Sequence, residues 1–176
     1  MEQVVLVDEN DTETGVMEKL QAHLEGRLHR AISVFIFNTK GELLLQQRAD
    51  DKYHSANLWT NTCCSHPRPG EIVIDAANRR LFEEMGMECK LKESFSFIYK
   101  AKLDSGLIEY EYDHVFTGVT EQIPAPNSKE VASWKYVSRE QLQNDMRKLP
   151  ESFTEWFKIC LHEYHKELFN EDIPVS

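Results

Sequence analysis

Two adjacent cysteines and a histidine stand out in the segment 60–71, whose sequence is TNTCCSHPRPGE. Its prolines exclude a helix interior, because each proline lacks a backbone donor and restricts the residue before it, so we expect a loop that presents reactive groups. In extended chain, neighbouring side chains point to opposite sides, and only Cys64 then shares a side with His66. We therefore expect a functional thiol at Cys64. We interpret Cys63 as a small buried hydrophobic residue, the usual state of a free cysteine.

A second group of ionisable side chains lies in residues 107–118, whose β-branched and aromatic residues predict a strand. Alternation along this strand puts Glu109, Glu111 and Asp113 on one face. An acidic face exposed to water is one explanation. Like charges on one strand face repel each other, however, unless a cation or a proton lies between them. This face is therefore a candidate metal or proton-transfer site.

Residues 71–86 carry apolar residues spaced by four and end at a glycine, which predicts a helix with a glycine cap. Two pairs of opposite charge are spaced i,i+4 along it, Arg79 with Glu83 and Arg80 with Glu84. On an isolated helix such pairs form a solvated face. Because this helix follows directly on the cysteine segment, its polar face can instead line the site which that segment builds.

The other elements must position these groups. The patterns at 31–37 and 42–48, joined by a turn ending in glycine, predict a β-hairpin of two central strands. Residues 17–26 favour a short helix or an ordered loop. Further strands are expected at 4–7, 94–103 and 131–137, with a turn at 104–106 and a polar loop at 50–57.

Two helices are expected near the C-terminus, at about 139–147 and 153–169. Ser138 with Gln141 and Ser152 with Glu155 have the spacing of a capping box, in which two side chains satisfy the first free backbone donors of a helix. An apolar stripe along the second helix indicates core packing, and on this basis alone Trp156 belongs to the core.

The composition limits the class of protein. A length of 176 residues with 41% hydrophobic residues suits one domain, residues 1–176, with a sizeable core. The net charge of −10 argues against a nucleic-acid or anionic-membrane surface, so an acidic chain that handles phosphate must gather its cations locally or use a metal ion. The four cysteines do not form a disulfide framework, and neither a signal region nor a spanning segment is recognised. A cytoplasmic protein is the expectation.

Residues 65–87 nearly match the Nudix box, Gly-x5-Glu-x7-Arg-Glu-U-x-Glu-Glu-x-Gly-U, in which U is a bulky apolar residue. Ser65 replaces the first glycine and Arg80 replaces a glutamate, whereas the remaining positions match: Glu71, Arg79, Leu81, Glu83, Glu84, Gly86 and Met87. A Nudix hydrolase uses its glutamates to hold divalent metal around a diphosphate. A guanidinium in place of one carboxylate exchanges a metal ligand for a phosphate clamp. The resemblance thus implies diphosphate binding with weakened hydrolysis.

The modified box, preceded by TNTCCSHP and followed by Glu-Tyr-Glu on a strand, closely resembles the type I isopentenyl-diphosphate Δ-isomerases. The likeness extends from Lys19 to Trp156. It implies a Nudix-like fold, α+β or α/β/α, with mixed β-sheets flanked by helices. It also implies a cytosolic, commonly monomeric enzyme of isoprenoid biosynthesis that interconverts isopentenyl diphosphate and dimethylallyl diphosphate.

The same resemblance implies two metal sites. A site for one Mn²⁺, Mg²⁺ or Zn²⁺ falls on three histidines and two glutamates, which are His23, His29, His66, Glu109 and Glu111; the ligand types do not choose among these ions. A substrate-linked Mg²⁺ falls on Glu84 and the backbone carbonyl of Cys64. No organic redox cofactor is implied.

Substrate-binding and catalytic roles are carried over in the same way. The diphosphate contacts fall on four cations, Lys19, Arg48, Lys52 and Arg80. Protonation of the substrate double bond yields a tertiary carbocation that then loses a proton elsewhere, so two proton-transfer groups on opposite sides are required. They fall on Glu111, which is a better acid when metal-bound and protonated, and Cys64, whose thiolate can remove a proton from C2. Tyr99 matches a tyrosine near the metal-bound glutamate, and Trp156 matches the aromatic residue over the cation.

Three functions remain open at this point. The isomerase is preferred, a Nudix diphosphate hydrolase is the alternative, and a non-catalytic module that binds a diphosphate is the third. The last would leave Cys64, Glu109 and Glu111 without a role. The expected partner is a small-molecule diphosphate, with neither nucleic acid nor membrane, and the chain is expected to be a monomer.

Overall fold

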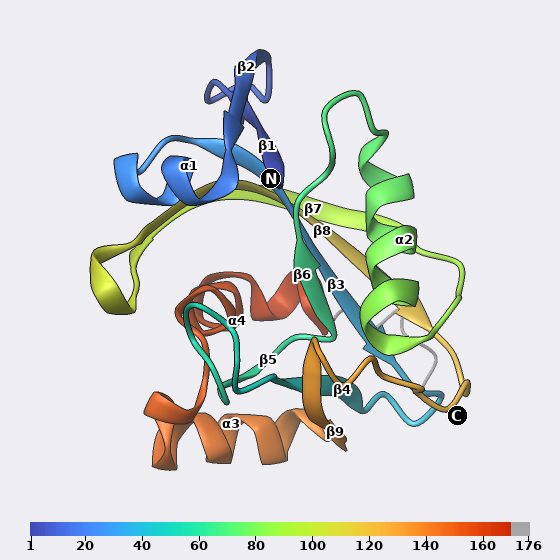
Figure 1. Cartoon of the computed structure of the whole chain (residues 1–176). Helices are drawn as coiled ribbons and strands as arrows, with labels where there is room; N and C mark the ends of the chain where they lie inside the picture. The colour runs from blue at the N-terminus through green and yellow to red at the C-terminus, as the bar shows by residue number, and fades with distance from the viewer. Residues whose placement is uncertain (170–176) are drawn as a thin grey trace.

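A mixed β-sheet runs through the molecule, and helices cover both of its faces (Figure 1). The computed structural model describes residues 1–169, and within them no helix is long and apolar enough to cross a membrane. The strands are β1 (Gln3–Val7), β2 (Glu13–Glu18), β3 (His29–Phe37), β4 (Leu43–Arg48), β5 (Trp59–Thr60), β6 (Cys63–Ser65), β7 (Lys92–Lys102), β8 (Ile108–Val119) and β9 (Val131–Val137). The helices are α1 (Lys19–Glu25), α2 (Val73–Met85), α3 (Arg139–Lys148) and α4 (Glu155–Leu168), with short 3₁₀ turns η1 (Asp104–Gly106) and η2 (Pro150–Ser152).

Strand β3 is the centre of the sheet. It pairs with β8 in parallel along its whole length, from His29 beside Glu111 to Phe37 beside Val119. It also pairs antiparallel with β1 and β6, and β8 in turn pairs antiparallel with β7. The expected mixed, α+β architecture is therefore confirmed.

The hairpin predicted for residues 31–48 is wrong except at its turn. The strands β3 and β4 pair only at Phe37 and Leu43 and then diverge, β4 toward β5 and β9. The Thr62 side chain bridges them where they part, because its hydroxyl donates to the Leu44 carbonyl oxygen at 2.6 Å and accepts from the Ile36 N–H at 2.9 Å. Because the strands do not pair here, the Ile36 N–H and the Leu44 carbonyl lack strand partners, and the Thr62 hydroxyl supplies their hydrogen bonds instead.

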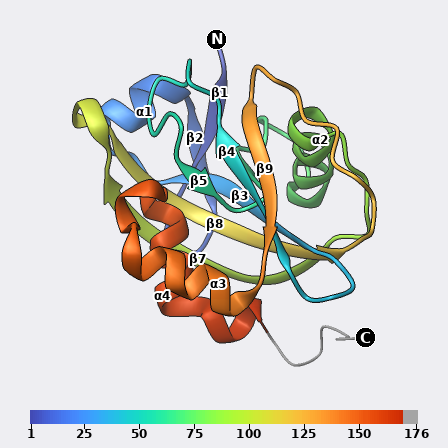
Figure 2. The ribbon, with the colours of Figure 1, turned by 90° about the horizontal axis from the view of Figure 1, so that it is seen from below.

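Helices α2 and α4 lie on opposite sides of the sheet, as Figure 2 shows. Because strand side chains alternate, Ile32 and Val34 of β3 pack in the core under α2, whereas Phe35 packs with Phe157 of α4. The layers are those of an α/β/α arrangement. Strand β6 contributes side chains to both cores: Cys63 packs in the core under α2, and Cys64 packs against the core that contains α4.

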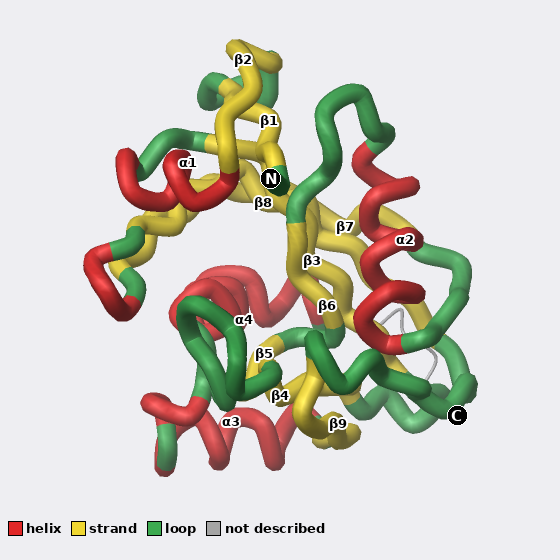
Figure 3. Tube along the Cα trace, viewed as in Figure 1, coloured by secondary structure: helices red, strands yellow, loops and turns green. Residues whose placement is uncertain are grey.

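The cysteine segment is only in part the loop that we expected. Residues 63–65 form strand β6 (Figure 3). In its pairing with β3, Cys64 lies opposite Ser33. The rest of the segment is the loop that we expected, since the residues between Ser65 and α2 contain no other regular element. Strand β2 was not predicted: it lies at the edge of the sheet, and none of its residues is buried.

Helix ends agree with the capping residues in three cases. Gly26 after α1 and Gly86 after α2 have φ of 61° and 62°, and the Ser138 hydroxyl accepts from the Gln141 N–H at the start of α3. The Ser152 cap is wrong: α4 begins after Thr154. The Thr154 hydroxyl does not cap the helix because it donates to the Thr60 hydroxyl.

Candidate active site

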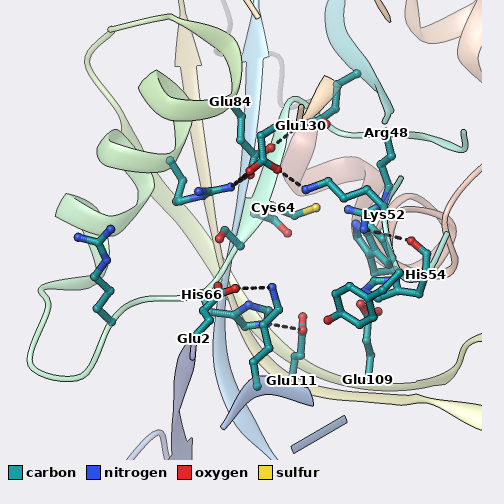
Figure 4. Close-up of a pocket in the computed structure, with 18 of the residues that line it drawn as sticks. Glu2, Arg48, Lys52, His54, Cys64, His66, Glu84, Glu109, Glu111 and Glu130 are labelled. Carbon is teal, nitrogen blue, oxygen red and sulfur yellow. Dashed lines mark hydrogen bonds and ion pairs between the residues drawn. The ribbon is translucent and has the colours of Figure 1, made fainter. Parts of the chain in front are cut away.

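A polar pocket of about 220 Å³ opens between the diverging strands and is drawn in Figure 4. Its wall contains every predicted site residue except His23 and His29, which lie buried behind it. His66, Glu109 and Glu111 lie at one end of the pocket, together with Glu2, which pairs with Lys19 (Figure 4). Arg48 and Lys52 lie at the other end with Glu84 and Glu130, and the Cys64 sulfur points into the space between the two ends. The pocket therefore joins the residue groups that the sequence presents separately.

Four of the five residues predicted to hold the protein-bound metal form one cluster. Each of His23, His29, His66 and Glu111 offers one ligand atom, and these atoms lie within 4.8 Å of one another. The His66 Nε2 and His29 Nε2 atoms lie 2.9 Å and 3.4 Å from Glu111 Oε1. The cluster draws on α1, on the start of β3, on the turn after β6 and on β8.

Hydrogen bonds to the backbone orient two of these imidazoles. The Nδ1 atoms of His23 and His29 lie 2.7 Å and 2.8 Å from the carbonyl oxygens of Lys19 and Arg27. Their Nε2 atoms are buried and form no hydrogen bond within residues 1–169. A ring nitrogen oriented by a carbonyl, with the other nitrogen left free, is the usual arrangement of a metal-binding histidine.

The protonation states suit a metal. Burial lowers the pKa of His66 to about 4 and also lowers that of His23, so both rings are neutral at neutral pH. A neutral imidazole is the form that binds metal. The described residues therefore include a group that fits a divalent metal ion.

The fifth predicted ligand lies slightly apart. Glu109 groups with His23 and with His54, a residue that the sequence reasoning had placed in a polar loop without a role. The Tyr99 hydroxyl connects the two glutamates, since it lies 2.6 Å from Glu111 Oε2 and 3.1 Å from Glu109 Oε2. The expected proximity of Tyr99 to Glu111 is thus observed.

The two glutamates differ in charge. Burial and the negative charge of Glu111 raise the pKa of Glu109 well above its usual value. Burial acts on Glu111 as well, but the neighbouring His29 and His66 imidazoles outweigh it, and the pKa of Glu111 lies well below its usual value. A proton on this pair is therefore held by Glu109 in preference to Glu111.

The two thiols occupy different environments. Cys63 is fully buried in the core under α2, whereas Cys64 packs against the other core and lines the pocket. This confirms the expectation from strand alternation. Burial raises the pKa of the Cys64 thiol, and nearby carboxylates add to the effect, so the neutral thiol is its form in this protein. The thiolate that we expected as a base forms only after the thiol has given up its proton.

Carboxylates pair with three of the predicted diphosphate-binding cations. Lys19 Nζ lies 3.1 Å from Glu2, Lys52 pairs with Glu130, and Arg80 lies 2.6 Å from Glu84 and 3.6 Å from Glu130. Arg48 instead donates to the His54 carbonyl oxygen and lies over the Trp156 ring at 5.2 Å. An anion at the Arg48 end of the pocket would meet three cations held in position, Arg48, Lys52 and Arg80.

Glu84, predicted to hold the substrate-linked Mg²⁺, is buried beside the pocket. Its two oxygens accept from Arg80 and from Gln46 Nε2, at 2.6 Å and 2.8 Å. The other ion pair of α2 is also present, with Arg79 Nη1 3.1 Å from Glu83. Arg79 also donates two hydrogen bonds to Glu71. We predicted that the helix would start at Glu71, but α2 starts at Val73.

Trp156 lies both in the hydrophobic core and in the wall of the pocket. Its side chain is buried in the core with Phe157, and it also lines the pocket between Arg48 and His54. Its Nε1 atom is buried and has no partner among residues 1–169. The geometry therefore allows the ring to act on a bound molecule as well as to fill the core.

The pocket wall also contains residues that sequence reasoning missed, among them Glu2, Gln46, His54 and Glu130. Gln46 shares a strand face with Arg48, so alternation along β4 contained a signal for it. Glu2 and Glu130 are single acidic residues outside any motif and gave no signal. His54 follows Lys52 in a polar loop, and only the fold brings it to His23.

The fold and the carboxylate-bearing helix define a Nudix protein: the NUDIX domain family model matches residues 27–157. A solved structure from Deinococcus radiodurans superposes with a TM-score of 0.74 at 18% identity, covering 93% of this chain and 99% of that one. A MutT protein from Methanosarcina mazei superposes with a TM-score of 0.64 at 18% identity, covering 80% and 94%. These likenesses concern the fold alone.

Curated relatives narrow the class. A protein of Pectobacterium atrosepticum named isopentenyl-diphosphate Delta-isomerase is 56% identical, over 89% of this chain and 88% of that protein. Isopentenyl-diphosphate Delta-isomerase 2 of Aromatoleum aromaticum is 53% identical, over 91% of this chain and 85% of that protein. The chain belongs to the isopentenyl-diphosphate Delta-isomerase family.

Proposed function

We propose that this protein interconverts isopentenyl diphosphate and dimethylallyl diphosphate, an isomerase reaction of isoprenoid biosynthesis. The relatives of about 50% identity that carry this name support the reaction. The observation that carries the proposal in the structure is the pocket itself, where the Cys64 thiol lies between a cation-lined end and a histidine–glutamate cluster. A diphosphate held at the first end brings its carbon chain between the other two groups.

The chemistry follows from the two proton-transfer groups. Cys64 carries a proton and Glu111 does not, so one group can add a proton to the allylic unit while the other removes one. Reversal of the reaction exchanges the two roles. Tyr99, hydrogen bonded to Glu111, can pass or hold the proton at Oε2. Trp156 forms part of the wall and offers a ring face that stabilises positive charge by roughly 0.5–2 kcal/mol.

Metal dependence is part of the proposal. His23, His29, His66, Glu109 and Glu111 would hold one Mn²⁺, Mg²⁺ or Zn²⁺, and Glu84 with the Cys64 carbonyl would hold a Mg²⁺ that accompanies the diphosphate. The first ion, when bound, supplies positive charge that keeps Glu109 and Glu111 together and makes a protonated Glu111 a stronger acid. The mixed imidazole and carboxylate donors support the site but do not select the ion.

Arg80 argues against the alternative of a diphosphate hydrolase. It occupies a position where the Nudix box has a glutamate, and its guanidinium lies against Glu84, the carboxylate that would otherwise gather metal. Fewer metal ligands around the diphosphate weaken the activation of water for hydrolysis. The same guanidinium is suited to bind phosphate oxygens.

Nuclear magnetic resonance distinguishes these functions. The protein is incubated with isopentenyl diphosphate and Mg²⁺ in D₂O, and proton and phosphorus spectra are recorded. We expect deuterium to enter the carbon chain and dimethylallyl diphosphate to appear without release of phosphate. Phosphate release would indicate a hydrolase, and unchanged substrate would indicate a module that only binds diphosphates.

A further inference from the structure

His54 is a buried histidine of the pocket wall for which the proposed function has no role. It lies in the loop between β4 and β5 and is 7% exposed. Its ring packs edge-on against Tyr53 at 4.4 Å, and the rings of His23 and Trp156 lie 6.0 Å and 6.1 Å away. Its carbonyl accepts a hydrogen bond from Arg48. The loop is thus held on both sides and directs His54 toward the metal cluster.

Two overlapping groups of ligand atoms meet at His23. One group contains His29, His66 and Glu111, and the other contains His54 and Glu109; in each, the atoms lie within 4.8 Å of one another. The Nδ1 atom of His23 lies 2.7 Å from the Lys19 carbonyl oxygen, so only Nε2 is left to bind a metal. One nitrogen binds one ion. The two groups therefore cannot bind two separate ions through His23.

We propose that His54 is a fourth imidazole ligand of the metal ion held by the His23, His29, His66, Glu109 and Glu111 group. The inference rests on the metal site of the proposed function and extends it by one ligand. Six donors, four imidazoles and two carboxylates, match a six-coordinate ion. His54 lies on the side of Glu109, the glutamate that is farther from the other histidines, and so completes the shell there.

An additional imidazole changes which ion the site prefers. Mg²⁺ favours oxygen ligands, whereas Zn²⁺ binds imidazole more strongly. Four imidazoles should therefore favour Zn²⁺ over Mg²⁺ more than three would. Replacement of His54 should lower the affinity for Zn²⁺ much more than that for Mg²⁺.

The test compares His54→Phe with His162→Phe in the full, metal-stripped chain. Phenylalanine keeps the ring contacts with Tyr53 and Trp156 but removes the nitrogen, and His162 is an exposed histidine of α4. Calorimetric titration with ZnCl₂ and with MgCl₂, without diphosphate, gives affinity and stoichiometry. X-ray absorption of the zinc-loaded proteins counts the imidazoles bound. His54→Gln, with thermal midpoints for all variants, serves if His54→Phe does not fold.

We expect one Zn²⁺ per chain, a Kd raised roughly 10- to 100-fold by His54→Phe, and one imidazole fewer in its absorption spectrum. The His162→Phe variant should match the unmodified chain. An unchanged Kd and imidazole count in His54→Phe would overturn the inference and leave the five-ligand site intact. Two ions per chain would overturn it as well, as would an unchanged Kd with a raised KM for the diphosphate. An unmodified chain that binds no Zn²⁺ would remove the proposed metal site itself.

Discussion

Replacement of each adjacent cysteine by alanine should separate a structural thiol from a reacting one. Cys63 is fully buried beside α2, so removal of its sulfur leaves a small cavity worth about 1 kcal/mol, similar to other single-group deletions in a core. In a chain of this length that loss lowers the thermal midpoint by about 2–4 °C. Turnover of the folded Cys63→Ala protein should remain close to normal.

Cys64→Ala should show the opposite pattern. The thiol is one of two proton-transfer groups, and loss of such a group typically costs 10²- to 10⁴-fold in rate, so we expect kcat to fall by about 10³. Its side chain only borders the core, and the midpoint should change less than that of Cys63→Ala. The assay measures dimethylallyl diphosphate formation beside the unfolding curve of each variant. A Cys64→Ala protein with more than about a tenth of normal activity, or equal losses in both variants, would refute the reasoning.

Three further outcomes test other parts of the site. Trp156→Phe should lower kcat about tenfold with KM nearly unchanged, because roughly 1.4 kcal/mol of stabilisation is lost in the transition state alone; a normal kcat with a lowered unfolding midpoint would return the ring to the core. Arg80→Ala should chiefly raise KM, by about tenfold, because the guanidinium is a proposed diphosphate ligand, and an unchanged KM in steady-state kinetics would contradict that role. In the metal-free chain burial lowers the pKa of His66 to about 4 and that of His54 to about 3, whereas the usual histidine pKa is 6.5. Below pH 6.5 the unfolded chain therefore binds more protons than the folded chain does. The free energy of unfolding from urea titrations should therefore fall as the pH is lowered from about 6.5 to about 4, and a constant or rising value would mean that these imidazoles are not neutral.

Local periodicity predicted much of the site. Alternation along β6 correctly separated Cys63 from Cys64, and alternation along β8 correctly put Glu109 and Glu111 on one face. Such predictions succeed because a strand alternates its side chains whatever the rest of the chain does. The family resemblance then named residues far apart in sequence, and the structure brings them to one pocket and to the two histidines, His23 and His29, buried behind it.

Long-range contacts decided what periodicity missed. The predicted hairpin fails because the Thr62 hydroxyl, from outside both strands, satisfies the backbone where they part. The Ser152 cap fails because Thr154 bonds to Thr60 across the fold. His54 reaches the cluster only through the path of its loop. None of these partners lies within one turn or one strand of the residue it controls, so no local pattern records them.

The parallel pairing of β3 with β8 also has a consequence for how the chain folds. Ser33 and Asp113, which are hydrogen bonded across these strands, are 80 residues apart in sequence. Closure of so long a loop is slow, because its entropy is lost before the contacts it brings together can form. His29 and Glu111 lie opposite each other in this pair of strands, so the cluster is complete only after the strands have met. Metal uptake during refolding should therefore lag behind the formation of α2 and of the β7–β8 hairpin, and a metal-sensitive probe would report the last step of folding.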